Sequence, residues 1–249
     1  MVGGMVWLRT RASAPALSSV AELCAFVSGQ LGSHADPAKA GPMAAYMKTD
    51  MPFYGVAKPE RDRIATAVKD RFPIADHHAY EQAVTGLWAL PHREEKYLAI
   101  RMARLYADFV TPRSLALYKR LIQDGAWWDF VDEIAIHLVG QVLHHHRPAV
   151  SPTLDAWITD QDMWLRRTAL LSQVHHMEDT DEGRLFGYCL QTADETAFFI
   201  RKAIGWALRD YSATAPERVL TFLHHNRGRL SSLSFREAAR RLKRQGYPL

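Results

Sequence analysis

The sequence has few cysteines, few strand signals and no long apolar stretch near its start, and each shortage excludes a class of protein. Two cysteines, Cys24 and Cys189, cannot form a disulfide framework, which fits a reducing compartment. The N-terminal residues lack an apolar run long enough for a signal peptide or a membrane span. We therefore expect a cytoplasmic protein with no membrane partner.

The chain is long enough to bury a sizeable core, with 249 residues of which 48% are hydrophobic. Residues 1–17 are rich in small and basic residues, and we expect them to form a flexible extension. Residues 18–249 are expected to form a single domain. We expect that domain to be a monomer with no obligate protein partner.

Positive charge is concentrated in the C-terminal part of the chain. From Arg201 to the end there are eleven Lys and Arg against three acidic residues, a net charge of +8, whereas the whole chain carries +4. The first 200 residues therefore sum to about −4. This asymmetry indicates a positive surface that faces a polyanion such as a phosphate backbone, or else a solvated terminal helix.

Apolar residues recur with helical periodicity in segment after segment, which predicts an all-α protein. Most prolines, Pro148 and Pro152 among them, are expected in gaps or first turns. The expected helices are 19–32, 38–49, 59–71, 76–89, 93–108, 112–123, 127–143, 151–158, 162–176, 181–193, 196–212, 215–226 and 233–245.

A small residue followed by a large apolar one repeats at nearly equal intervals. Ala99, Ala135, Ala169 and Ala203 take equivalent places, at spacings of 36, 34 and 34 residues. A mid-thirties period that holds two helices is typical of an α-solenoid of HEAT-like repeats. We expect such a superhelix to present a concave groove suited to binding DNA.

The run from Trp127 to Asp132 is the strongest chemical signal in the chain. On a helix, Trp128 and Asp132 lie four residues apart and share one face. Relative to the repeating alanines, Asp132, Arg167 and Arg201 fall on equivalent edges of successive helices, so we expect them to line one surface. Taken alone, the tryptophans are also compatible with core positions, and Asp132 with a purely structural pair to Arg167.

In these segments the chain resembles the DNA alkylation-repair glycosylases of the HEAT-like repeat type, the AlkD family. The matching motifs begin with Tyr46-Met47-Lys48, Phe53-Tyr54-Gly55-Val56 and Pro59-Glu60-Arg61. They continue with Trp127-Trp128-Asp129-Phe130-Val131-Asp132, Trp164-Leu165-Arg166-Arg167 and the stretch from Phe199 to Arg209. The resemblance covers roughly residues 20 to 245, and the order and spacing of the motifs make it specific.

The resemblance implies a role for each matching position. The catalytic carboxylate falls on Asp132, and the cleft aromatics fall on Trp128 and Trp206. The cleft arginine falls on Arg167. Tyr46 matches a further aromatic of the cleft and Arg209 a residue near the DNA backbone, and no metal or cofactor is implied. From its place in the repeat we expect Arg201 to contact DNA as well.

The activity implied is hydrolysis of the N-glycosidic bond of cationic N3- and N7-alkylated purines in duplex DNA, which leaves an abasic site. A cationic base is already a good leaving group, so the chief requirement is to stabilise the oxocarbenium-like sugar. A carboxylate at Asp132 meets this need, and electron-rich tryptophan faces favour a cationic nucleotide. The resemblance also implies that the base stays stacked instead of flipping into a pocket.

Two other classes of protein remain open on the residues alone. A non-enzymatic helical-repeat module that binds structured nucleic acid or a protein has no use for a carboxylate such as Asp132 facing phosphates. A protein scaffold predicts an apolar groove rather than one bearing arginines. The histidine pairs and the run His144-His145-His146 suggest metal binding only weakly, because neighbouring histidines on a helix diverge and lack partners at ligand spacing.

Overall fold

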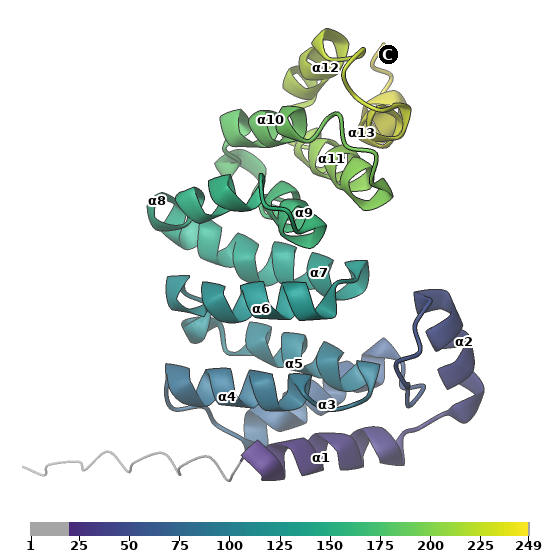
Figure 1. Ribbon diagram of the computed structural model, residues 1–249, viewed down its shortest axis with the longest axis vertical. Helices are drawn as coiled ribbons and strands as arrows, with labels where there is room; N and C mark the ends of the chain where they lie inside the picture. Colours follow the sequence, from purple (N-terminus) through teal and green to yellow (C-terminus); the bar gives the residue numbers. More distant parts are fainter. Residues whose placement is uncertain (1–19, 249) are drawn as a thin grey trace, which may run out of the picture. The chain divides into compact units, whose positions relative to one another are not determined.

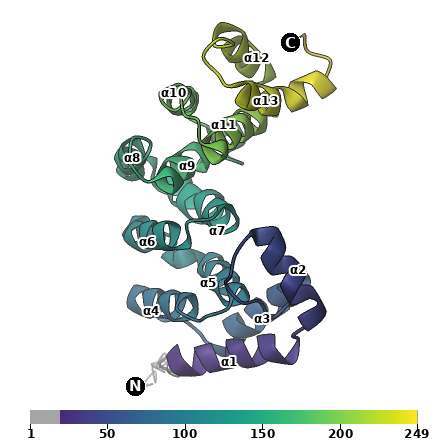
Figure 2. The ribbon, with the colours of Figure 1, turned by 45° about the vertical axis from the view of Figure 1, so that its right-hand side comes forward.

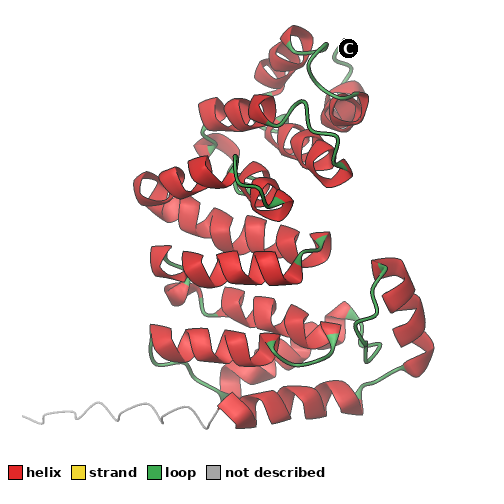
Figure 3. Ribbon diagram, viewed as in Figure 1, coloured by secondary structure: helices red, strands yellow, loops and turns green. Residues whose placement is uncertain are grey.

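The computed structural model describes residues 20–248, so the expected N-terminal extension lies outside the described residues. Figure 3 shows only helices and the loops that join them in this part of the chain. The predicted all-α, helical-repeat fold is confirmed. No helix in the described part of the chain is both long enough and apolar enough to cross a membrane.

The chain divides into two compact units, Met1–Leu98 and Ala99–Leu249. The expectation of one domain over residues 18–249 stays a prediction. The described part of the first unit contains α1 (Val20–Ser33), α2 (Pro37–Met47), α3 (Lys58–Arg71), α4 (His77–Trp88) and the first part of α5 (Arg93–Leu105). The second unit contains the rest of α5, α6 (Leu115–Gly125), α7 (Trp128–Ile134), α8 (Gly140–Trp157), α9 (Met163–Leu171), α10 (Glu182–Gln191), α11 (Phe198–Tyr211), α12 (Pro216–His225) and α13 (Ser232–Arg244).

The core of the first unit forms where α1 packs on α3 and α4. Leu23, Val27 and Leu31 recur every four residues along one face of α1 and are fully buried. The start of α4 is fixed by a side-chain cap, because the Asp76 carboxylate accepts a hydrogen bond from the backbone N–H of Ala79 at 2.8 Å.

Helix α2 is held by a loop rather than by a core, since it has no buried residue. The loop that follows it is bound by the fully buried carboxylate of Glu94, which accepts the backbone N–H groups of Tyr54 (3.1 Å), Gly55 (2.8 Å) and Val56 (3.1 Å). Gly55 has φ +86°, and a Cβ there would lie 2.1 Å from the carbonyl oxygen of Asp36. Only glycine fits this close approach to the start of α2.

In the second unit the helices form two layers (Figures 1 and 2). Helices α7, α9, α11 and α13 succeed one another in one layer, and α6, α8, α10 and α12 form the other. The repeating alanines predicted from the sequence lie at the interior of this stack, because Ala99, Ala135, Ala169 and Ala203 are all at most 1% exposed. The 34–36-residue period is therefore a packing period.

Several helix boundaries differ from the prediction. The helix expected over 93–108 ends at Leu105, and the one expected over 162–176 ends at Leu171. In the loop after Leu171, His175 and Met177 have positive φ, which no glycine marks in the sequence. The helices expected over 127–143 and 151–158 run on as α7, a π-helical turn (Ala135–Val139) and α8.

The gap expected between residues 143 and 151 is absent, and the helix has a single kink there. His146 has non-helical angles (φ −133°, ψ 38°), and helix resumes directly after it. Pro148 therefore lies in the first turn of the resumed helix, as predicted. Pro152 was predicted in a gap or first turn and lies inside α8 instead, because the helix resumes before it.

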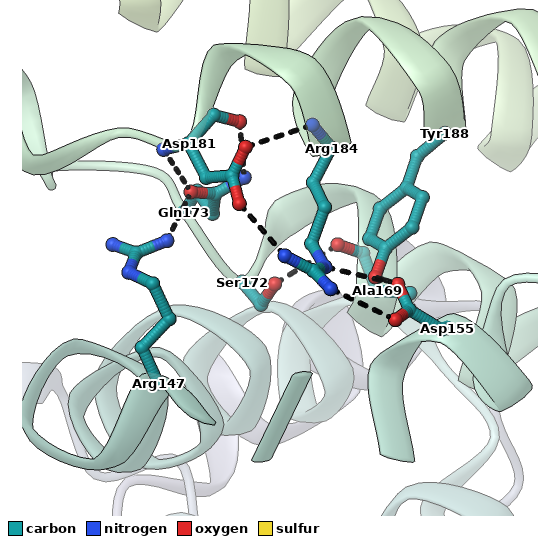
Figure 4. A network of polar contacts seen from close by, with 8 residues as sticks. All are labelled: Arg147, Asp155, Ala169, Ser172, Gln173, Asp181, Arg184 and Tyr188. Carbon is teal, nitrogen blue, oxygen red and sulfur yellow. Dashed lines mark hydrogen bonds and ion pairs between the residues drawn. The ribbon is translucent and has the colours of Figure 1, made fainter. Parts of the chain in front are cut away.

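A polar network that the sequence did not indicate ties α8 to α10 and to the loop before α10 (Figure 4). Asp155 of α8 accepts both Arg184 Nε and Nη2 at 3.0 Å and the Tyr188 hydroxyl at 2.6 Å. Asp181 caps α10 and exchanges two hydrogen bonds with Gln173. The loop after α9 is thereby anchored to both neighbouring helices.

Candidate active site

Asp132 and Arg167 form a bidentate ion pair inside the second unit. Asp132 lies in the last turn of α7, and Arg167 lies in the middle of α9, which packs beside it. Arg167 Nε donates to Asp132 Oδ1 at 2.7 Å, and Nη2 donates to Oδ2 at 2.9 Å. The Arg167 side chain is 5% exposed and that of Asp132 is 13% exposed. The predicted cleft acid and cleft arginine are thus direct partners.

Two opposing effects act on the Asp132 carboxyl. Burial raises its pKa above the ordinary aspartate value, and the charges of Asp129 and Glu133 act in the same direction. The hydrogen bonds and charge of Arg167 oppose this rise. The two parallel N–H groups of the Arg167 guanidinium favour the carboxylate form, but the net effect still leaves the pKa of Asp132 above the ordinary aspartate value.

Phe199, at the start of α11, completes the surroundings of Arg167. Arg167 Nη1 donates to the Phe199 carbonyl oxygen, and the guanidinium carbon lies 5.8 Å from the Phe199 ring centroid. The ring packs with Trp164 (centroids 5.0 Å apart) and with Trp127 (5.5 Å). This aromatic cluster of Trp127, Trp164 and Phe199 fixes the position of Arg167.

The contact between Phe199 and Arg167 is not evident from the sequence. The residue stands at the head of a recognised motif, yet its contact with Arg167 depends on the packing of α11 against α9. Trp164 takes one of the core positions with which the tryptophans are compatible, because it is 8% exposed.

Trp128 and Trp206 are both half-buried. Trp128 is the first residue of α7 and lies one turn before Asp132. Trp206 lies on α11, two turns beyond Phe199 and therefore on the same side of that helix. Their direct contact with a nucleotide stays a prediction.

A π-helical turn, Ala135–Val139, joins the end of α7 to the start of α8. Such turns occur mostly as single-turn insertions and are frequent at functional sites. Where it ends, Gly140 lies against the loop after α9, since a Cβ there would be 2.6 Å from the carbonyl oxygen of Ser172. The Gly140 carbonyl oxygen is 3.0 Å from Nε2 of buried His176. Burial, together with the charge of His144, lowers the pKa of His176 to about 4, so its ring is neutral at pH 7.

The remaining predicted site residues lie in different surroundings. Arg201 Nε donates to the Glu195 carbonyl oxygen at 2.9 Å, which fixes the loop before α11. Arg209 Nη1 lies 2.8 Å from Oε2 of Glu237 on α13. Tyr46 lies in the first unit, near the end of α2, and is 72% exposed. The DNA contacts of all three stay predictions.

The histidines form local contacts with acids and with one another. His144 and His176 have ring centroids 4.9 Å apart, and His175 Nδ1 lies 3.2 Å from Asp210. Among residues 20–248, no group of three or more His, Cys, Asp or Glu side chains is arranged to hold a metal ion.

Comparison with known families identifies the chain's relatives. The family model for the DNA alkylation repair enzyme matches residues 27–242, which include every residue of the Asp132–Arg167 surroundings described above. The chain belongs to this family. Membership supports a role in DNA repair, with DNA as the partner.

Solved structures agree with this assignment. A predicted DNA alkylation repair enzyme from Enterococcus faecalis superposes with a TM-score of 0.78 at 28% identity, over 84% of this chain and 97% of that one. AlkD2 from Streptococcus mutans gives 0.58 at 14% identity, over 80% and 97% of the two chains. The protein smu.31 from Streptococcus mutans UA159 gives 0.57 at 13% identity, over 73% and 91%. The two Streptococcus proteins share the fold. A search of the curated proteins found no match.

Proposed function

We propose that this member of the family is a DNA glycosylase that hydrolyses the N-glycosidic bond of cationic N3- and N7-alkylated purines in duplex DNA. The observation that carries the proposal is the Asp132 carboxylate, bound by two parallel N–H groups of Arg167 in a nearly buried place. Such a carboxylate is oriented in advance and is poorly solvated, which is the condition under which it best stabilises developing positive charge.

The geometry leaves Asp132 able to act. A carboxylate has about four acceptor sites, and the two Arg167 hydrogen bonds occupy two of them. The others accept no hydrogen bond from the described residues, and in this proposal they take a water molecule and face the sugar as it gains oxocarbenium character. Asp132 then lowers the barrier by charge and positions the attacking water, while the cationic base leaves without an acid.

In this proposal the tryptophans select nucleotides that carry a positive charge. Trp128 and Trp206 present electron-rich faces to a cationic nucleotide, each worth about 0.5–2 kcal/mol. Recognition through backbone and deoxyribose leaves the base stacked, so the site needs no base pocket. Release of a bulky N7 adduct as well as of a methylated purine tests this part, since a tight flipping pocket excludes the bulky base.

The test compares Asp132→Asn with Asp129→Asn on alkylated duplex DNA. Both changes remove one negative charge from α7, but only the first removes the partner of Arg167. We expect base release to fall about 100-fold or more for Asp132→Asn, with DNA affinity kept, and to stay near wild type for Asp129→Asn. Equal activity of the two variants contradicts the proposal.

A second function is favoured by the same ion pair. Asp132 is paired to a nearly buried arginine, which suits a purely structural role in a non-enzymatic module that binds nucleic acid. That function predicts tight DNA binding without base release from the wild-type protein. Measuring affinity and release on the same preparation separates the two.

A further inference from the structure

A basic pocket lies where α13 packs on α11. It has a volume of about 480 Å³ and is lined by Arg209 of α11 and by Arg240, Lys243 and Arg244 of α13. Figures 1 and 2 show α13 lying directly against α11. This pocket contains none of the residues around Asp132.

The sequence builds this pocket by dividing α13 into two faces. Ala238, Ala239 and Leu242 are fully buried. Arg240, Lys243 and Arg244 follow at spacings of three and four, so they share the other face. The basic side of the helix is thus turned outward by the burial of its apolar side.

Close packing fixes the two helices that line the pocket. A Cβ on Gly205 would lie 2.4 Å from Cβ of Glu237 and 2.9 Å from the Ser234 carbonyl oxygen, so only glycine allows α13 to come this near. Ser234 Oγ also donates to the Arg201 carbonyl oxygen at 3.0 Å. The pocket is therefore a built feature and not a chance grouping of surface chains.

One carboxylate partly neutralises these cations. Glu237 lies 2.8 Å from Arg209, 3.1 Å from Lys202 and 3.4 Å from Arg240. Burial acts to raise the pKa of Glu237, but the hydrogen bond from Lys202 and the nearby positive charges outweigh it and hold the pKa below the ordinary value. Four lining cations against this one anion leave a net charge of +3. Among residues 20–248, Lys243 and Arg244 form no ion pair.

We propose that this pocket binds phosphodiester groups of the DNA backbone, away from the lesion, as a second anchor for the duplex. The inference rests on the proposed function, because that function supplies the DNA. Exposed cations without acidic partners are what phosphate binding requires, whereas a merely solvated helix gains from interspersed acids. The pocket accounts for four of the eleven Lys and Arg residues in the C-terminal part of the chain.

The test is the salt dependence of duplex affinity for Lys243→Gln/Arg244→Gln. Each phosphate contact contributes about 0.9 to the slope of log K against log salt, so losing two contacts should reduce the slope by roughly 2 and weaken binding roughly 50-fold at 0.1 M salt. The control, Arg113→Gln/Arg229→Gln, removes two exposed arginines that do not line the pocket and should leave the slope unchanged. Glu237→Gln should change the slope in the opposite direction, because it removes the only carboxylate in contact with the lining cations among the described residues.

Base release separates this inference from the proposed function. With DNA saturated by excess protein, Lys243→Gln/Arg244→Gln should release bases at the wild-type rate. An unchanged slope in that variant, or an equal loss in the control, overturns the pocket as a DNA site even if release is normal. If DNA binding depends on the pocket but the wild-type protein releases no base, the proposed glycosylase activity is refuted and DNA binding at the pocket is supported. Binding of inorganic phosphate at constant ionic strength, lost in the variant while DNA affinity is kept, assigns the pocket to small anions and also overturns the inference.

Discussion

Replacing Arg167 with methionine should destabilise the protein strongly. The change keeps a long side chain in the space but leaves the Asp132 carboxylate, 13% exposed, without a cation. Removing one partner of a buried ion pair costs about 3–5 kcal/mol, because the remaining charge is uncompensated. For a protein of this size, 1 kcal/mol lowers Tm by about 2–4 °C, so we expect a fall of roughly 6–20 °C.

The loss should depend on pH in a definite direction. Burial already raises the pKa of Asp132, and without Arg167 the pKa rises further. A carboxyl whose pKa is higher in the folded than in the unfolded state binds its proton more tightly when folded. The penalty in Arg167→Met should therefore be full at neutral pH and should shrink as the pH falls through the raised pKa.

Unfolding of the wild type, Arg167→Met, Asp132→Asn and the double variant gives the measurement, at pH 7 and at pH 5. The double variant should be more stable than the sum of the single losses predicts, because neither charge is then left alone. Arg184→Met is the control, since its pairs with Asp155 and Asp181 are about one-quarter to one-half exposed and should each cost at most about 1 kcal/mol. A loss in Arg167→Met no larger than in this control refutes the reasoning.

Three further predictions concern residues outside the ion pair. Gly140→Ala should lower stability by about 1–3 kcal/mol, because its Cβ would meet the Ser172 carbonyl oxygen at 2.6 Å; Gly183→Ala, whose nearest contact is 3.5 Å, is the control in the same melting experiment. Glu94→Gln should cost about 1–3 kcal/mol by urea unfolding, because an amide N–H₂ replaces one of the oxygens that accept backbone N–H groups; a normal midpoint would contradict this. The wild type should lose stability as the pH falls from about 6.5 towards about 4, since His176 takes up its proton more readily when unfolded; His176→Gln should remove that part of the loss, and an unaltered pH profile would rule it out.

The helical repeat and the proximity of Asp132 to Arg167 could be predicted from the sequence for a physical reason. Ala169 and Ala203 mark the points where successive helices pack closely, so their spacing reports the fold directly. Asp132 and Arg167 occupy equivalent edges of neighbouring helices, and equivalent positions in a repeat lie side by side.

Other features depend on tertiary contacts that leave no pattern in the sequence. The π-helical turn after Asp132 has no residue signature, and the period of the apolar residues there is that of an ordinary helix. Beyond the end of α9 at Leu171, the left-handed angles of His175 and Met177 turn the chain without a glycine, within a loop that the hydrogen bond from the His175 N–H to Asp210 helps to hold. Phe199 contacts Arg167 only because α11 packs on α9.

Helix α2 has a consequence for the dynamics of the first unit. A helix with no fully buried residue is expected to open at a free energy well below that of global unfolding, so its amide hydrogens should exchange early and as a group. The Glu94 carboxylate opposes that opening through its hydrogen bonds to the loop after α2. The end of α2 that carries Tyr46 can thus open and reclose while the surrounding helices keep their packing, and a ligand that contacts Tyr46 would slow this exchange by ordering the helix.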